Sequence, residues 1–338
     1  MRKPSEPQST SRSRAVRLES FGGPEVLEIL EVPAPRAGPG QVRVRVTAAG
    51  LNPMDWLITA NADTAARFGL SLPAGFGTDY AGVVDQVGDG VTGFAPGDRV
   101  FGGALSRAVA DFVVVDTGDT AANEAHPTPD GVDDRTAATL TIAGRTASAA
   151  LAVVGLGPED TVLIGGAAGG VGVFLVQLAR LAGARVLGTG SATSAEFLRG
   201  LGAEPVPYGD GLADRVRALA PRGLTAAIDL HGTETVHAAR ALGVPDTRIT
   251  TIAAQVDGVT PANGANSAPG ALEKLAHLVA TGRLRVPIAA SFPLERIRDA
   301  VELQAGRHVK GKVVIDLESG ALMLWSPPAM SAAQRRLS

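Results

Sequence analysis

The sequence has no cysteine among its 338 residues. This excludes disulfides, thiolate zinc sites and cysteine nucleophiles, and it fits a cytoplasmic protein. Long apolar runs are also missing, because none approaches the roughly 18 residues that a membrane span requires. Charge of one sign is not in excess, since 31 Lys and Arg stand against 34 Asp and Glu, for a formal net charge of −3. We therefore expect neither a membrane partner nor a nucleic-acid partner.

Histidine is scarce as well, and its five copies stand at no spacing typical of metal ligands. A lone histidine is more often a packed or solvated side chain than a ligand. The sequence therefore predicts no bound metal. The five residues are His126, His231, His237, His277 and His308.

A glycine-rich loop between a strand and a helix is the strongest local signal. Residues 161–164 form a β-branched, apolar run, residues 170–182 have an amphipathic helical pattern, and a second strand is expected at 185–189. The loop is not a strict G-x-G-x-x-G, but in this context backbone N–H groups and the helix dipole converge at a site that suits a pyrophosphate. We expect dinucleotide contacts from Ala168, Gly169, Gly170, Val171 and Gly172.

The patterns divide the chain into two domains. Up to about residue 125, short strands of period two alternate with turns, which predicts an antiparallel, partly open β-barrel. From about residue 133, strands and helices alternate, which predicts an α/β domain with a doubly wound parallel sheet. The expected limits are 1–14 for a disordered tail, 15–138 with 286–325 for the barrel domain, 139–285 for the cofactor domain and 326–338 for a flexible tail. The active site would lie in the cleft between the domains.

Six short motifs occur in an order and spacing that resemble one family over nearly the whole chain. They stand at 49–55 (AGLNPMD), 77–83 (GTDYAGV), 96–100 (PGDRV), 143–147 (AGRTA), 167–172 (AAGGVG) and 311–314 (GKVV). As a set they resemble the medium-chain dehydrogenase/reductase superfamily, in its zinc-free branch of quinone oxidoreductases and enoyl reductases. The resemblance implies a GroES-like barrel domain plus a Rossmann domain.

The zinc-dependent branch of this superfamily carries a cysteine where Asn52 stands and a histidine where Thr78 stands. The resemblance therefore implies hydride transfer without zinc, from NADPH to a quinone or an α,β-unsaturated carbonyl such as an enone. Three alternatives stay open. They are an enoyl-thioester reductase, a tailoring enzyme of secondary metabolism that could be redox-neutral, and a non-catalytic NADPH-binding protein.

The resemblance also implies roles for single residues. Asn52 would lie beside the nicotinamide, although it could instead be only a turn residue before Pro53. Thr146 would line the same pocket, and Tyr208 would lie near the adenosine ribose. Tyr80 could donate a proton to the acceptor or could be a packed aromatic of the barrel.

The cofactor type follows from the end of the second strand, where NAD-specific Rossmann sites place a carboxylate. Residues 188–194 read GTGSATS, and the first acid, Glu196, lies already in the next helix. NADPH is therefore favoured, with Ser191 and Thr193 near its 2′-phosphate. Hydroxyls bind phosphate more weakly than an arginine does, so use of NADH stays possible.

Two surface segments carry further expectations. Residues 255–270 are rich in Gly, Asn and Pro, so the sixth strand of the parallel sheet should be truncated or absent. A homodimer through that sheet edge, usual for the family, is then in doubt. Acceptor specificity is expected in loops at 57–73 and 101–107.

Overall fold

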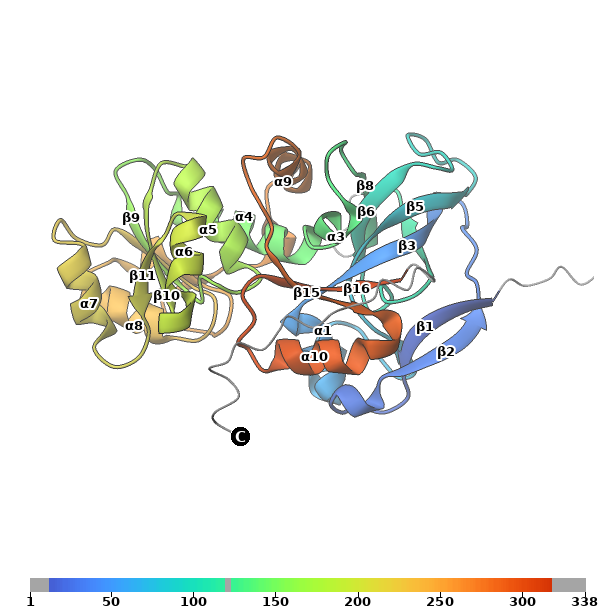
Figure 1. Ribbon diagram of the computed structural model, residues 1–338, viewed down its shortest axis with the longest axis horizontal. Helices are drawn as coiled ribbons and strands as arrows, with labels where there is room; N and C mark the ends of the chain where they lie inside the picture. Colours follow the sequence, from blue (N-terminus) through green and yellow to red (C-terminus); the bar gives the residue numbers. More distant parts are fainter. Residues whose placement is uncertain (1–11, 119–122, 318–338) are drawn as a thin grey trace, which may run out of the picture.

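The computed structural model describes residues 12–118 and 123–317 (Figure 1). The predicted tail at 326–338 and residues 1–11 of the predicted N-terminal tail lie outside these ranges. Residues 12–14 do not belong to a tail, because strand β1 (Arg12–Leu18) begins at residue 12 and pairs with β2 (Glu28–Pro33) from its first residue. The strand thus begins three residues before the predicted start of the barrel domain, because these residues also pair with β2 through the backbone.

The N-terminal domain is built from antiparallel strands that curl around an apolar core. In β3, Val42, Val44 and Val46 are buried while Arg43 and Arg45 point outward, as the period-two pattern predicts. A seven-stranded sheet has the order β15-β16-β3-β5-β6-β8, with β7 paired to β3, and a small sheet has the order β2-β1-β4. The remaining bounds are β3 (Gln41–Leu51), β4 (Ala74–Gly75), β5 (Asp79–Val87), β6 (Arg99–Ala104), β7 (Phe112–Asp116), β8 (Asn123–Pro127), β15 (Ile288–Pro293) and β16 (Lys312–Asp316).

The second domain is a parallel sheet of six strands in the order β11-β10-β9-β12-β13-β14. This order reverses between β9 and β12, and such a reversal opens a crevice at the carboxyl ends of the strands. The predicted α/β class, a barrel plus a doubly wound parallel sheet, is confirmed. The bounds are β9 (Thr161–Gly165), β10 (Arg185–Gly190), β11 (Glu204–Pro207), β12 (Ala226–Asp229), β13 (Ile249–Thr251), β14 (Thr260–Pro261), α5 (Gly172–Leu181), α6 (Ala195–Leu201), α7 (Leu212–Leu219) and α8 (Glu234–Ala241).

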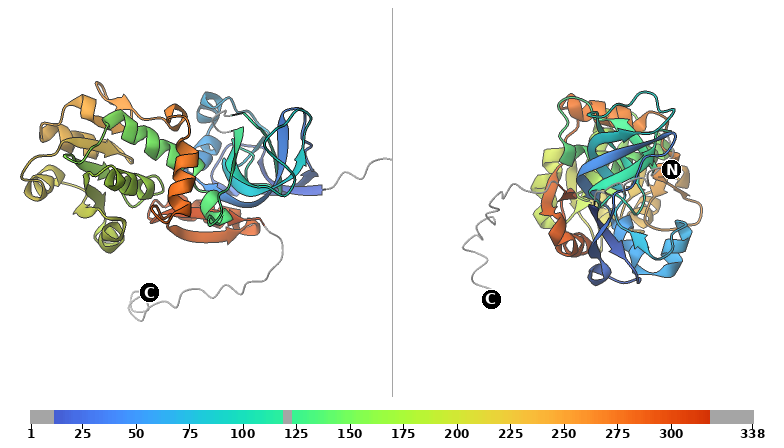
Figure 2. Two further views of the ribbon diagram at one scale, coloured as in Figure 1. Left: turned by 90° about the horizontal axis from the view of Figure 1, so that it is seen from above. Right: turned by 90° about the vertical axis from the view of Figure 1, so that its right-hand side faces the viewer.

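The barrel and the parallel sheet lie side by side along the long axis of the molecule (Figures 1 and 2). The chain returns from the second domain through α9 (Ala271–Ala280), β15, α10 (Ile297–Ala305) and β16. Because β15 and β16 join the barrel's sheet, the first domain includes this C-terminal segment. The limits at 138/139 and 285/286 stay predictions.

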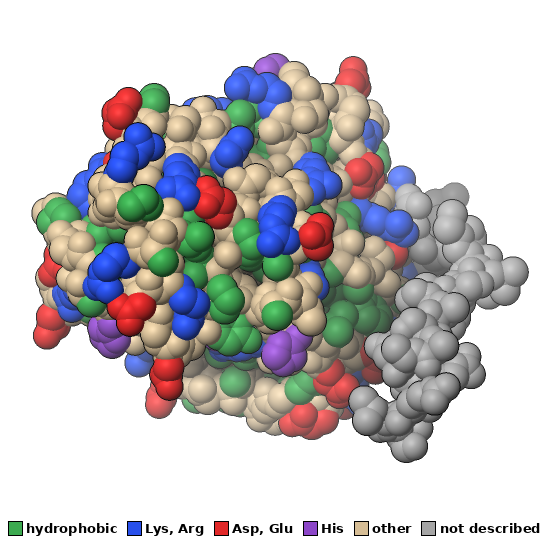
Figure 3. Space-filling view, turned by 60° about the vertical axis from the view of Figure 1, so that its left-hand side comes forward, with side chains coloured by type: hydrophobic (Ala, Val, Ile, Leu, Met, Phe, Trp, Pro, Cys, Tyr) green, Lys and Arg blue, Asp and Glu red, His purple; other side chains and the backbone are tan. Residues whose placement is uncertain are grey.

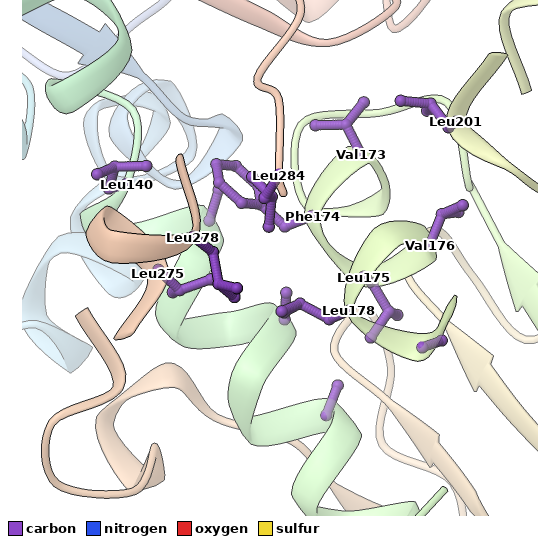
Figure 4. Close-up of a cluster of buried hydrophobic side chains, with 14 of the residues drawn as sticks. Leu140, Val173, Phe174, Leu175, Val176, Leu178, Leu201, Leu275, Leu278 and Leu284 are labelled. Atoms are coloured by element: carbon purple, nitrogen blue, oxygen red, sulfur yellow. The ribbon is translucent and has the colours of Figure 1, made fainter. Parts of the chain in front are cut away.

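Three helices, α4 (Thr141–Val154), α5 and α9, share a buried apolar cluster between the domains (Figure 4). Leu275 and Leu278 of α9 lie near α4, while Phe174, Leu175 and Leu178 come from α5 (Figure 4). Burying a leucine or phenylalanine side chain contributes about 1.5–3 kcal/mol. This cluster therefore packs α4 against α5, the helix that begins at the glycine loop.

The helical segment that follows Asp133 is broken into two helices, α3 (Asp134–Ala137) and α4. Strand β3 passes close to the break, since a Cβ on Gly50 would lie 2.1 Å from the carbonyl oxygen of Ala138. The amide of Ile142 bonds the Asp79 carboxylate instead of continuing a single helix. Contacts from the barrel thus divide a segment of uniform helical propensity.

The expected loop at 57–73 is largely helical, which corrects the sequence prediction. Helices α1 (Pro53–Ala60) and α2 (Ala62–Arg67) occupy it. Asn61 accepts a hydrogen bond from the Thr64 amide at 2.9 Å and so caps α2. Asn and Asp at such positions favour both turns and caps, which is why the composition alone suggested a loop.

The sixth strand, β14, has only two residues, so its predicted truncation is confirmed. The following turn at 264–266 packs on α4 instead of extending the sheet: a Cβ on Gly264 would lie 3.0 Å from Thr146 Oγ1.

None of the helices within the described ranges has the length and apolar character to cross a membrane. On the face drawn in Figure 3, positive and negative side chains are interspersed.

Candidate cofactor and active site

The glycine loop lies at the carboxyl end of β9, beside the point where the strand order reverses. Helix α5 begins at Gly172, and in the described structure no side chain caps it at Val171. The first amide groups of a helix have no partner within it, so they can bind an anion. Gly172 is required here because a Cβ would lie 2.4 Å from the carbonyl oxygen of Ala167. The five residues expected at a pyrophosphate therefore form one tight turn, Ala168–Gly172.

A cluster of hydroxyl groups follows β10. Ser191 Oγ lies 2.9 Å from Thr193 Oγ1 and 3.0 Å from Ser194 Oγ. Gly190 pairs with Pro207 of β11, so Ser191 and Tyr208 follow neighbouring strand ends on the same edge of the sheet. Tyr208 is 56% exposed. The structure thus brings the predicted adenosine-side residues to one edge.

Asn52 stands where β3 ends and α1 begins, and it is only 3% exposed. Its Nδ2 donates to Asp79 Oδ2 at 3.0 Å, and its Oδ1 accepts from Lys312 Nζ at 2.7 Å. Its backbone N–H donates to Asp55 Oδ2 at 2.8 Å. Asn52 therefore joins β5 and β16 through its side chain and the first turn of α1 through its backbone, so it is more than a turn residue before Pro53.

Asn52 belongs to a buried polar network that sequence reasoning missed in part. Thr78 Oγ1 donates to Asp55 Oδ1 at 2.8 Å, and Lys312 Nζ lies 4.0 Å from Asp79 Oδ2. All of these side chains are at most 4% exposed. Lys312 belongs to one of the six motifs, but nothing in the local pattern shows that it lies against residues some 260 positions earlier.

Two carboxyl groups of the network have pKa values raised toward neutral pH. Burial raises the pKa of Asp79 to about 7, although Lys312 and the Asn52 hydrogen bond oppose the shift. Burial likewise raises the pKa of Asp55 to about 6, against hydrogen bonds from Asn52 and Thr78. Burial lowers the pKa of Lys312, which the two carboxylates partly offset. The network can therefore hold or release a proton near neutral pH.

The network adjoins the glycine loop directly. The backbone N–H of Gly311 donates to the carbonyl oxygen of Ala168 at 2.9 Å. A Cβ on Gly170 would lie 3.3 Å from Cδ of Lys312. The expected pyrophosphate turn and the network around Asn52 are thus parts of one continuous site.

Thr146 lies on α4, one turn after Ile142, whose amide bonds Asp79 Oδ1 at 3.1 Å. The hydroxyl of Thr146 donates to the Ile142 carbonyl oxygen at 2.7 Å. This places Thr146 beside the network, with the turn at Gly264 packed on it. Its expected role in lining a nicotinamide pocket stays a prediction.

Tyr80 is buried in the barrel core, and its hydroxyl donates to the Glu124 carbonyl oxygen at 2.8 Å. Burial raises the pKa of this hydroxyl far above its usual value. A buried, engaged phenol that resists ionisation is a poor proton donor or relay. Of the two roles left open by the sequence, the geometry favours the packed aromatic.

The acceptor role expected for residues 57–73 and 101–107 stays a prediction. Phe68 is 42% exposed, whereas Leu70 lines a small cavity with Ile58 and Ala65 under α1 and α2. A larger cavity of about 140 Å³ lies between α4 and the start of α9, lined by Arg145, Ser267 and Glu273 among others. Apart from Arg145, the residues that line this second cavity all lie between 265 and 273.

Metal ligands are not assembled here: the described ranges contain no group of three His, Asp or Glu side chains that could hold a metal ion. At the two positions where the zinc-dependent branch has ligands, Asn52 and Thr78 are both engaged with carboxylates.

Two protein-family models match parts of the chain. Residues 38–128 match the alcohol dehydrogenase GroES-like domain, and residues 201–315 match the zinc-binding dehydrogenase domain. The chain belongs to the medium-chain dehydrogenase/reductase superfamily. The motif resemblance is thereby confirmed.

Members of this superfamily resemble the chain in sequence and in fold. Rat quinone oxidoreductase is 39% identical over 192 residues, which cover 55% of each chain. The chain thus spans about half the length of this relative. The quinone oxidoreductase from Coxiella burnetii superposes with a TM-score of 0.81 at 28% identity, covering 91% of this chain and 100% of that one. A mycobacterial protein solved in complex with NADPH gives a TM-score of 0.77 at 26% identity, over 91% of this chain and 100% of that one.

Proposed function

We propose that the protein is an NADPH-dependent, zinc-independent reductase that transfers hydride to a quinone or an α,β-unsaturated carbonyl. The observation that carries the proposal is the contact between the glycine loop and the buried network, through Gly311 with Ala168 and Gly170 with Lys312. This contact puts an expected dinucleotide cradle next to buried groups that can hold a proton. The similarity to quinone oxidoreductases supports the acceptor class.

The residues present fit the cofactor. The turn Ala168–Gly172 would hold the pyrophosphate, because no side chain caps the amide groups at the start of α5. The backbone is also tightly turned there, since a Cβ on Gly172 would clash with the Ala167 carbonyl oxygen. Ser191 and Thr193 would lie at the 2′-phosphate and Tyr208 at the adenosine ribose. Asn52 and Thr146 would lie beside the nicotinamide ring, which supplies the hydride.

The protein's own groups orient the acceptor and supply the second half of the reduction. An acceptor that gains a hydride also needs a proton at oxygen or carbon. Lys312 donates to Asn52 Oδ1, Asn52 donates in turn to Asp79, and burial raises the pKa of Asp79 to about 7, so this chain of groups would supply the proton. Since quinones and enones are already electrophilic, positioning and this modest proton source suffice without a metal.

The test is titration of the purified full-length protein with NADPH and then NADH, followed by intrinsic fluorescence. Oxidation of the reduced nicotinamide is then monitored with a simple benzoquinone, an enone and an unsaturated thioester. Turnover of the quinone or the enone supports the proposal. Preference for the thioester would identify an enoyl-thioester reductase. Binding without turnover of any acceptor would indicate a non-catalytic NADPH-binding protein or a redox-neutral tailoring enzyme. Failure to bind either dinucleotide would overturn the proposal.

The cellular and quaternary settings stay predictions. We expect a cytoplasmic protein that acts on small molecules without a nucleic-acid or membrane partner. Dimerisation through the edge strand is in doubt because β14 offers only two residues for pairing. The mass of the protein in solution, measured by light scattering, decides between a monomer and a dimer.

A further inference from the structure

The turn expected at the 2′-phosphate offers hydroxyl groups but no charge of its own. Ser191, Thr193 and Ser194 hydrogen-bond one another through their side chains. The nearest following acid, Glu196, is turned to solvent with a side chain that is 93% exposed and pairs with Arg199 at 3.1 Å. Neutral hydroxyls alone bind a phosphate dianion weakly compared with a cationic donor. The selectivity expected for NADPH therefore needs a cation from elsewhere in the chain.

Lys310 supplies a cation at this turn. Its Nζ donates to the carbonyl oxygen of Thr193, across 117 positions of sequence. Lys310 is half-buried, and within the described residues no carboxylate forms an ion pair with it. Its ammonium is thus held at the hydroxyl cluster by a backbone carbonyl, and its charge stays available to an anion.

The backbone around Lys310 is fixed by the cofactor cradle itself. The next residue, Gly311, donates to the Ala168 carbonyl oxygen at 2.9 Å. The residue after that, Lys312, donates to Asn52 Oδ1 at 2.7 Å. Three consecutive residues therefore touch the three expected parts of the site, namely the 2′-phosphate turn, the pyrophosphate loop and the nicotinamide side.

We propose that Lys310 binds the 2′-phosphate of NADPH and sets the preference for NADPH over NADH. This inference rests on the proposed function. A lysine ammonium has three N–H donors, so it can keep the Thr193 carbonyl while donating to a phosphate oxygen beside Ser191. The coenzyme preference is then decided by a residue of the segment that returns to the barrel, not by the second strand of the cofactor domain.

The experiment compares dissociation constants of NADPH and NADH for wild type, Lys310→Met, Lys310→Arg and the control Lys274→Met, which alters an exposed lysine of α9. Losing a charge-assisted hydrogen bond should weaken NADPH binding by about tenfold or more and leave NADH binding unchanged. Lys310→Arg should restore most of the affinity for NADPH, and Lys274→Met should resemble wild type. The affinity of wild type for NADPH should also fall more steeply with salt than that of Lys310→Met.

Competition with adenosine 2′,5′-bisphosphate and with AMP separates the adenosine side from the nicotinamide side. Lys310→Met should lose affinity for the bisphosphate alone. Equal loss for both nucleotides, or no loss, would overturn the inference while leaving the proposed function intact. A wild type that prefers NADH would also overturn it. A wild type that binds neither dinucleotide would instead remove the proposed function.

Discussion

Gly311 and Ala168 are joined by a backbone hydrogen bond of 2.9 Å, which links the last strand of the barrel domain to the glycine loop of the cofactor domain. Gly311 has a φ of +102°, and a Cβ there would lie 2.2 Å from the Pro287 carbonyl oxygen. Only glycine meets both conditions without displacing the backbone. The placement of Lys310 and Lys312 at the site therefore depends on this one residue.

Replacing Gly311 by alanine should destabilise the protein by about 2–4 kcal/mol, because backbone strain and a backbone clash add. Gly282→Ala is the matched control, since Gly282 also has positive φ, at +67°, but a Cβ added there would meet no atom within 4 Å. It should lose about 1 kcal/mol. Chemical denaturation measures both, and equal losses would show that the contact with Pro287 does not matter.

Replacing Gly169 by alanine should separate folding from cofactor binding. A Cβ on Gly169 would meet only the Gly166 carbonyl oxygen, at 3.4 Å, so the free energy of unfolding should change by less than about 1 kcal/mol. The methyl group would nevertheless keep the backbone away from a pyrophosphate and weaken NADPH binding by about tenfold or more. Fluorescence titration and thermal unfolding test the two effects. Gly118→Ala, with open space around its Cβ, serves as the control, and unchanged NADPH binding in Gly169→Ala would contradict the location of the pyrophosphate.

Asp79 should make stability fall as pH rises toward neutrality. Burial raises its pKa in the folded state to about 7, above the ordinary value of 3.8. A carboxyl group with a raised folded pKa contributes stability that is complete below its unfolded pKa and is lost as pH rises through the folded pKa. The window is therefore about pH 4 to 7. Asp79→Asn should flatten this dependence in denaturant unfolding, whereas Asp63→Asn, an exposed change, should not. A wild type whose stability is flat across this window would show that Asp79 is not protonated in the folded state.

Tyr80→Phe tests the packing role of this side chain. The variant leaves the buried Glu124 carbonyl oxygen without its 2.8 Å donor, so stability should fall by about 1–3 kcal/mol. We expect turnover of a quinone to stay within about twofold of wild type, because a buried hydroxyl bonded to the Glu124 carbonyl oxygen is a poor proton donor. Steady-state kinetics and thermal unfolding are compared on one preparation. A loss of about a hundredfold in kcat would return Tyr80 to the role of proton donor.

Several features were decided by local sequence. The β-branched run at 161–164, the glycines after it and the amphipathic helix predict a nucleotide-binding turn because each step depends on neighbouring residues only. The truncated sixth strand follows in the same way from Gly, Asn and Pro at 255–270. Strand β11 carries little strand signal in the sequence, because its four residues include two prolines.

Other features depended on the tertiary structure. The division of 135–154 into α3 and α4 comes from the approach of β3 and the bond between Ile142 and Asp79. The roles of Lys310 and Lys312 come from contacts with Thr193 and Asn52 over 117 and 260 positions of sequence. Periodicity and turn chemistry describe neighbours along the chain, and they determined the two-domain fold and the glycine turn. The tertiary structure alone brings the charged groups of the buried site together, because β16 pairs with the barrel's sheet. Such contacts depend on distances in space that no local pattern records.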